Sequence, residues 1–208
     1  MHYQQQKRII DICLALILFI LFLPVWVIVP LLIIIDSGFP VFFRHKRVGK
    51  DGKEFFLYKF RSMVKNADDI LYKHNNELLE KFKNGDWKVE AKDDPRITKL
   101  GAVLRALTID EFPQLYNVLK GDMSMIGPRA YIQRELDEQT VKYPDTKKYV
   151  KDILSVKPGI TGVWQTSGRN EIPFSKRAQM DAEYARNQSL LRDILIILKT
   201  PKAMISKW

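Results

Sequence analysis

The stretch ICLALILFILFLPVWVIVPLLIII, residues 12–35, contains no charged side chain and decides how this chain is organised. As one straight helix it would extend about 36 Å, enough to cross a hydrocarbon layer of about 30 Å. Pro24 lies at its centre, where a proline removes a backbone donor and clashes with the carbonyl one turn back. The sequence therefore predicts a helix that breaks near Pro24, with a second interruption at Pro30.

Positive charge flanks both ends of this apolar segment. Lys7 and Arg8 precede it, and four cations follow it: Arg44, Lys46, Arg47 and Lys50. Because positive charge marks the cytoplasmic side, a spanning helix would satisfy only one cluster. A re-entrant hairpin, which enters and leaves through the same leaflet, satisfies both. We favour a re-entrant helix-break-helix over residues 1–38 and keep the spanning helix as the alternative.

Composition sets the limits for the rest of the chain. Residues 39–208, roughly 170 in number, suffice for a single domain with its own core, which we expect to be cytosolic, membrane-associated and catalytic. The formal charge of +10 suits an anionic partner, whether phospholipid, phosphorylated substrate or nucleic acid. The one cysteine, Cys13, lies in the apolar segment, which excludes a disulfide framework and a thiolate metal site.

The pattern of apolar and turn residues predicts an α+β domain that is mostly helical. Residues 41–60 indicate a β-hairpin around Asp51-Gly52. Helices are predicted over residues 66–82, over 98–120 with a break near Thr108 and an end at Gly121, and over 175–208 until Pro201. The apolar stripe within residues 190–198 could lie on a membrane surface or in the core, and we favour the core.

The segment TIDEFPQL, residues 108–115, carries the strongest chemical signal. Pro113 fits only the first turn of the following helix, so Asp110 is expected at or beside its N-terminus. There the free N–H groups and the helix dipole favour an ionised carboxylate. Thr108 and Glu111 also match a capping box, which would make Glu111 structural. This segment alone favours capping; catalysis is the alternative, and a helix N-terminus can serve both because it also accepts phosphate.

Several cations could converge on a phosphate: Lys59, Arg61, Arg96, Arg105, Arg129 and Arg169. Guanidinium groups chelate phosphate oxygens in a bidentate manner, although each cation taken singly is more simply a solvated surface charge. The sequence contains neither a P-loop nor a Gly-x-Gly-x-x-Gly turn. A phosphorylated substrate would therefore be held by Arg and Lys together with a metal ion.

Five ordered motifs make the chain recognisable: KRIID at 7–11, YKFRSM at 58–63, DPRIT at 94–98, DEFPQLYNVLKGDMS at 110–124 and KPGITGVWQ at 157–165. Over nearly its whole length the sequence resembles the monotopic phosphoglycosyl transferases, also called bacterial sugar transferases. The resemblance implies a re-entrant membrane helix, a small β-hairpin and amphipathic interfacial helices around the active site. It also implies a place on the cytoplasmic face of the bacterial inner (plasma) membrane.

The implied reaction is transfer of a sugar 1-phosphate from a UDP-sugar to undecaprenyl phosphate, with release of UMP and a requirement for Mg²⁺. It would be the first membrane step of polysaccharide or glycoconjugate biosynthesis. Asp110 matches the nucleophile that forms a phosphosugar-aspartyl intermediate and Glu111 its dyad partner, and both would engage the metal. The predicted substrate-binding set comprises Lys59, Arg105, Arg129 and Arg169, at family positions associated with phosphate and uridine, and Arg61.

Two departures from the family pattern bear on the predicted structure. The usual Pro-Arg-Pro is Pro128-Arg129-Ala130 here, which reduces the expected rigidity around Arg129. The Ser-Pro often found at the membrane bend is Leu23-Pro24, which weakens the re-entrant interpretation.

The insertion at residues 66–92 and the segment 164–170 look closer to the branch that handles galactose or glucose. The expected partners are a UDP-sugar, undecaprenyl phosphate and membrane lipids, without nucleic acid, and a homodimer is left open. The alternative from another class is a membrane-tethered basic adaptor without turnover.

Overall fold

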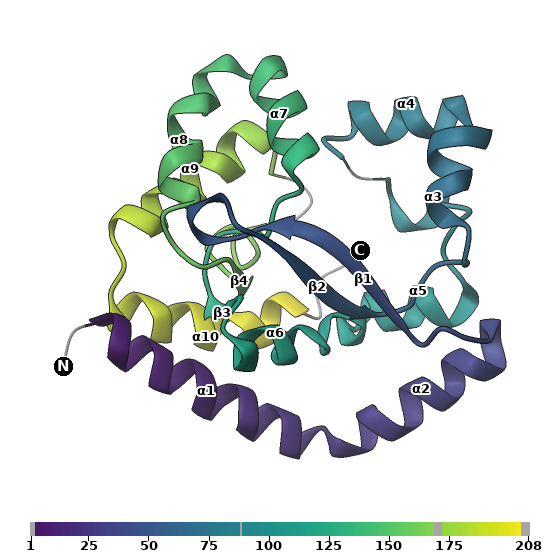
Figure 1. Ribbon diagram of the computed structural model, residues 1–208, viewed down its shortest axis with the longest axis horizontal. Helices are drawn as coiled ribbons and strands as arrows, with labels where there is room; N and C mark the ends of the chain where they lie inside the picture. Colours follow the sequence, from purple (N-terminus) through teal and green to yellow (C-terminus); the bar gives the residue numbers. More distant parts are fainter. Residues whose placement is uncertain (1–2, 88, 169–171, 205–208) are drawn as a thin grey trace.

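A computed structural model describes residues 3–87, 89–168 and 172–204. Helices surround two small sheets, and a long bent helix pair runs along one side of the molecule (Figure 1). The elements are α1 Tyr3–Leu21, α2 Leu23–Ser37, β1 Phe42–Val48, β2 Glu54–Phe60, α3 Ala67–Asp69, α4 Asn76–Asn84, α5 Lys99–Ala106, α6 Gln114–Lys120, β3 Ser124–Ile126, α7 Gln133–Lys142, α8 Lys147–Ile153, β4 Gly159–Thr161, α9 Phe174–Arg186 and α10 Leu190–Met204. The predicted α+β class, mostly helical, is confirmed.

The apolar segment forms two helices that meet at an angle of 63°. Pro24 lies in the first turn of α2, where its missing N–H is not needed, so the predicted break is confirmed. The interruption predicted at Pro30 is wrong, because Val29 and Ile33 pack on the core and α2 continues through the proline. No single helix among the described residues is long and apolar enough to cross a membrane, whereas the bent pair meets that test of length and composition jointly.

Both ends of the helix pair are fastened to the same domain, the end of α2 by Arg61 and the start of α1 by several contacts. Near the start of α1, Lys7 forms a buried ion pair of 2.9 Å with Asp193 of α10. One turn later, Asp11 accepts hydrogen bonds from the hydroxyl of Ser124 and the N–H of Met125. Arg8 donates to two carbonyls at the end of α6. These contacts explain why a long apolar helix begins with three charged side chains.

The hairpin forms where the sequence predicts it. Strands β1 and β2 pair antiparallel from Phe42 opposite Phe60 to Val48 opposite Glu54. Asp51 and Gly52 make the turn with φ angles of 58° and 74°, the left-handed region that this dipeptide tolerates.

A second sheet was not predicted. Strands β3 and β4 pair in parallel, with Ser124 opposite Gly159 and Ile126 opposite Thr161. Each strand has three residues, too few for an alternating pattern to be visible in the sequence. The backbones approach closely there, since a Cβ on Gly159 would lie 2.0 Å from the amide nitrogen of Gly127.

The helix predicted over residues 66–82 is broken. Asn75 ends a π-helical turn that follows α3, and its side chain accepts a hydrogen bond from the N–H of Leu78 (2.9 Å) to cap α4. An asparagine that bonds to a nearby backbone group competes with a continuous helix. The break predicted near Thr108 and the end at Gly121 are confirmed, whereas α10 continues past Pro201 to Met204.

The core interpretation of the apolar stripe in α10 is wrong for four of its six residues. Leu191, Ile194, Leu195 and Leu198 are 48–71% exposed, whereas Ile197 packs on the core. Asp193 and Ile196 are the buried residues of this helix. Lys7 and Tyr184 bind the side chain of Asp193 and hold it against the core. The four exposed leucine and isoleucine side chains therefore lie on the outward side of α10.

Candidate active site

Asp110 and Glu111 lie in a 3₁₀ turn, Ile109–Glu111, between α5 and α6. Thr108 precedes this turn with a left-handed φ of 59°, and this kink turns Asp110 inward, where it is 2% exposed. The side chain of Thr108 makes no capping hydrogen bond; its hydroxyl lies 3.4 Å from the carbonyl oxygen of Met204. The capping-box interpretation is therefore wrong.

Lys59 of β2 faces both carboxylates. Its Nζ is 2.6 Å from Oε1 of Glu111 and 3.6 Å from Oδ2 of Asp110. The other oxygen of Asp110, Oδ1, is buried and has no hydrogen-bond partner among the described residues. A carboxylate oxygen left free in a buried turn can bind a cation or attack an electrophile.

Burial raises the pKa of Asp110 above its usual value, the Lys59 ammonium opposes this effect, and the neighbouring Glu111 adds to it. From the sequence we expected a helix N-terminus to favour the ionised form. The structure differs because desolvation dominates and Asp110 lies before a helix of only seven residues. Burial therefore disfavours the ionised form of Asp110, and the charges of Lys59 and Arg105 favour it.

Arg105 of α5 is the second cation that acts on the dyad. Its Nε donates to the hydroxyl of Ser62 (2.9 Å). Burial lowers the pKa of Arg105, and the negative charge of Asp110 opposes this effect. Helix α5 packs so tightly on the preceding loop that a Cβ on Gly101 would lie 1.9 Å from the carbonyl oxygen of Ser62. This close packing fixes Arg105 relative to the dyad.

Two of the candidate cations lie elsewhere. Arg61 donates to the hydroxyl of Ser37 (2.7 Å) and to the carbonyl of Gly38, at the C-terminal end of α2. Arg96 forms a buried bidentate pair with Asp94 at 2.7 and 2.8 Å. Arg61 is thus not brought to the dyad, and its nearest partners give it a capping role. Arg169 lies outside the described residues.

Arg129 follows the tight Gly127-Pro128 step, and its guanidinium lies 5.7 Å from the ring centre of Trp164. The Arg129 N–H donates to the carboxylate of Asp181 (3.1 Å). Two residues later, the carbonyl of Tyr131 accepts a hydrogen bond from the N–H of Val48 in β1 (2.9 Å). The loop is therefore held from α9 and from β1, which offsets the rigidity expected to be lost through alanine at 130.

Arg47 is not among the substrate-binding residues predicted from the sequence, where it counts only as a positive charge after the apolar segment. Its Nη1 donates to the carbonyl of Ala130 (3.0 Å) and lies 4.0 Å from Glu135. Burial and the charge of Arg129 lower the pKa of Arg47, and the negative charges of Glu135 and Glu111 oppose this effect. Strand alternation was the available signal, because it puts Arg47 on the same face of the hairpin as Lys59.

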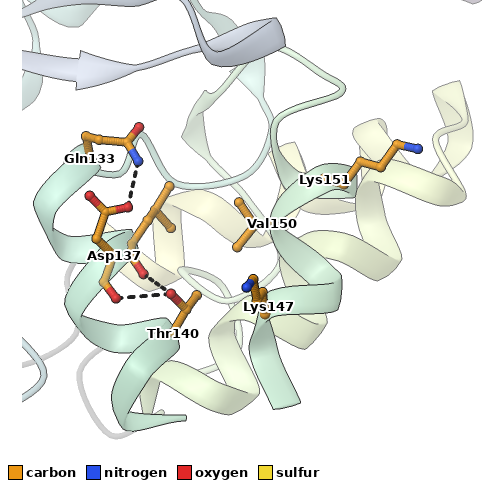
Figure 2. A pocket seen from close by; sticks show the side chains of 7 residues that line it. Gln133, Asp137, Thr140, Lys147, Val150 and Lys151 are labelled. Atoms are coloured by element: carbon orange, nitrogen blue, oxygen red, sulfur yellow. Dashed lines mark hydrogen bonds between the residues drawn. The ribbon is translucent and has the colours of Figure 1, made fainter. Parts of the chain in front are cut away.

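The described residues contain no group of three or more His, Cys, Asp or Glu side chains that could hold a metal alone. Asp110 and Glu111 nevertheless fit Mg²⁺, which is usually bound by one or two carboxylates together with waters and substrate phosphates. The unpartnered Oδ1 of Asp110 supplies a buried ligand atom. A pocket between α7 and α8 is lined by none of the candidate residues (Figure 2).

Two neighbouring carboxylates beside a lysine and an arginine are suited to group transfer on an anionic substrate, the chemistry of a transferase. The chain belongs to the bacterial sugar transferase family, whose model matches residues 2–207. It is an enzyme of that family, as the resemblance implied.

Curated relatives carry related names. An undecaprenyl-phosphate galactose phosphotransferase of Salmonella typhimurium is 40% identical over 205 residues, covering 97% of this chain and 40% of that protein. The exopolysaccharide production protein ExoY of Sinorhizobium fredii is 37% identical over 203 residues, covering 95% and 84% respectively. A UDP-glucose:undecaprenyl-phosphate glucose-1-phosphate transferase of Xanthomonas campestris is 39% identical over 170 residues, covering 79% and 31%. The chain thus spans less than half of two of these relatives and most of ExoY.

Proposed function

We propose that the protein transfers a sugar 1-phosphate from a UDP-sugar to undecaprenyl phosphate and releases UMP. The observation that carries the proposal is the buried dyad, with Lys59 in contact with both carboxylates and Oδ1 of Asp110 free of hydrogen bonds within the described chain. The names of the Salmonella and Xanthomonas relatives support galactose or glucose as the sugar.

In this mechanism Oδ1 of Asp110 attacks the β-phosphorus of the donor. A bond forms between the carboxylate oxygen and phosphorus, the anhydride bond to the α-phosphate breaks, and UMP leaves with the electron pair. A phosphate oxygen of the lipid then attacks the same phosphorus and regenerates the carboxylate. Lys59 and Arg105 support the first step by keeping Asp110 ionised and by neutralising the donor phosphates.

Asp110 and Glu111 would hold Mg²⁺. When bound, the ion supplies positive charge that lets two anions approach each other. Arg129, with its side chain 26% exposed, would contact the donor's phosphates from the neighbouring loop.

We further propose that α1 and α2 form a re-entrant anchor at the cytoplasmic face of the plasma membrane. Their two far ends are fastened to one domain, which supports placing both ends on one side of the bilayer. Their outward faces are apolar at Leu16, Ile17, Ile20, Leu21, Val27, Ile28, Leu31, Leu32 and Ile35. The exposed stripe of α10, with Val103 of α5 and Leu107 just after it, would lie in the membrane interface. The dyad follows α5 directly and would thus lie at the level of the lipid phosphate.

The test is a panel of UDP-sugars, each incubated with the purified protein, undecaprenyl phosphate and Mg²⁺, with UMP as the readout. UMP release with UDP-galactose or UDP-glucose, dependent on the lipid for multiple turnovers, would support the proposal. An adaptor without turnover would release none with any donor.

A further inference from the structure

The hairpin carries two cations on one face. Lys59 is opposite Phe43 and Arg47 is opposite Phe55, and residues two apart along a strand share a face. The two backbone positions are therefore about 13 Å apart along the strands. Lys59 contacts the dyad, while Arg47 contacts the loop that carries Arg129.

Glu135 of α7 lies between the two arginines. One of its carboxylate oxygens is 4.0 Å from Nη1 of Arg47, and the other is 3.8 Å from Nε of Arg129. Both distances exceed a hydrogen bond, and both oxygens of Glu135 lack a hydrogen-bond partner within the described chain. The Glu135 carboxylate thus keeps the guanidinium groups of Arg47 and Arg129 near each other without forming a hydrogen bond to either.

Three guanidinium groups meet around Glu135: those of Arg47, Arg129 and the fully buried Arg177. The carboxylates of Asp181 and Asp86 lie near Arg177 as well. Burial and the charge of Arg129 lower the pKa of Arg47 to about 10, which leaves it a cation. An anion that joined Arg47 and Arg129 would offset the repulsion between them.

The two arginines are also reachable. The side chain of Arg47 is 16% exposed and that of Arg129 is 26% exposed, close to the 25% of Lys59 and of Glu111. The Nε atoms of Arg47 and Arg129 are buried and have no hydrogen-bond partner within the described chain, so a phosphate would be bound through the other nitrogens of the two guanidinium groups. Guanidinium donors at such an edge match the oxygens of a phosphate.

We propose that Arg47 is a further substrate-binding residue, which with Arg129 binds the nucleoside-linked phosphate of the donor while the sugar-linked phosphate reaches Lys59 and the dyad. Glu135 is a positioning residue for this pair. The inference rests on the proposed function, because it assumes a nucleoside diphosphate donor.

The test measures binding of UMP, which keeps only the nucleoside-linked phosphate, to the full-length protein by calorimetry. Arg47→Lys keeps the charge but loses the bidentate fork, and we expect it to weaken UMP binding about tenfold and to raise the KM for the UDP-sugar similarly. The KM for undecaprenyl phosphate and the melting temperature should not change. Arg44→Lys, on the exposed face of the same strand, is the matched control and should bind UMP like the wild type.

Arg47→Gln provides a second variant if Arg47→Lys folds poorly, since it keeps an N–H donor for the Ala130 carbonyl and removes the charge. The double variant Arg47→Lys/Arg129→Lys should lose less UMP affinity than the two single losses combined, because one phosphate engages both side chains. Unchanged UMP affinity in Arg47→Lys and Arg47→Gln, with normal UMP release by the wild type, would overturn the role of Arg47 alone. Failure of the wild type to turn over any UDP-sugar would instead contradict the proposed function.

Discussion

The Lys59 ammonium lies 2.6 Å from the carboxylate of Glu111, although the two residues are 52 positions apart in the chain. This contact joins the β-hairpin to the turn that holds the dyad. The same ion pair directs the Glu111 side chain toward Lys59. In a capping box that side chain would instead bind the backbone at the start of the helix.

Asp110→Asn should abolish turnover while the protein stays folded. The amide keeps the size of the side chain but is a far poorer nucleophile, so we expect a loss of roughly 10³-fold or more. Mass spectrometry after incubation of the wild type with the correct UDP-sugar and Mg²⁺, without lipid, should detect a sugar phosphate on the protein. A folded Asp110→Asn protein with substantial activity would favour direct attack by the lipid phosphate.

Glu111→Gln should reduce kcat by roughly 10²-fold, because the amide loses the charge that pairs with Lys59 and binds Mg²⁺. The activity should be measured across Mg²⁺ concentrations, with circular dichroism as the control for folding. A folded variant with wild-type turnover would show that the charge of Glu111 is not needed for catalysis.

Arg61→Ala should destabilise the protein by about 1–3 kcal/mol, because it leaves polar groups at the end of α2 without their donor. Thermal unfolding in detergent measures this loss. The KM of the remaining folded enzyme for the UDP-sugar should stay at the wild-type value. A raised KM with an unchanged melting temperature would restore the substrate-binding assignment made from the sequence.

Asp181→Asn should make stability less dependent on pH. The folded-state pKa of Asp181, about 7, lies above the unfolded value near 3.8. The unfolded state therefore releases its proton first, and burial of Asp181 costs stability progressively from about pH 4 to 7, up to roughly 4 kcal/mol. Asparagine keeps an oxygen that accepts from Tyr131 and Arg129. The melting temperature of the variant relative to wild type should rise between pH 5.5 and 8; a constant difference would contradict the raised pKa.

Cysteines introduced at Gln4 and Lys46, both exposed, should be labelled only from the cytoplasmic side. Cys13→Ser removes the native thiol from the background. Labelling is measured in intact cells and in inverted vesicles with an impermeant reagent. Labelling of position 4 from outside, with position 46 labelled from inside, would establish a spanning helix and overturn the re-entrant anchor.

The sequence by itself determined the elements whose cause is local. Pro24 fixes the bend of the apolar segment because a proline lacks the backbone donor, and Asp51-Gly52 fixes the hairpin turn because both residues tolerate positive φ. The resemblance to the family, not the local pattern, singled out Asp110 and Glu111 as a dyad, and the structure places Lys59 against them and Arg105 within range of the charge of Asp110.

Only the tertiary structure decided the contacts between distant segments. Arg61 and Lys59 are two residues apart in YKFRSM, yet one binds the end of α2 and the other binds the dyad. Arg47 meets the Arg129 loop 83 positions later, at the Ala130 carbonyl. The burial of Asp110, which raises its pKa, was not foreseen for the same reason, because a motif gives the position of a carboxylate but not its burial. Desolvation depends on every segment packed around the group, and local sequence does not record that packing.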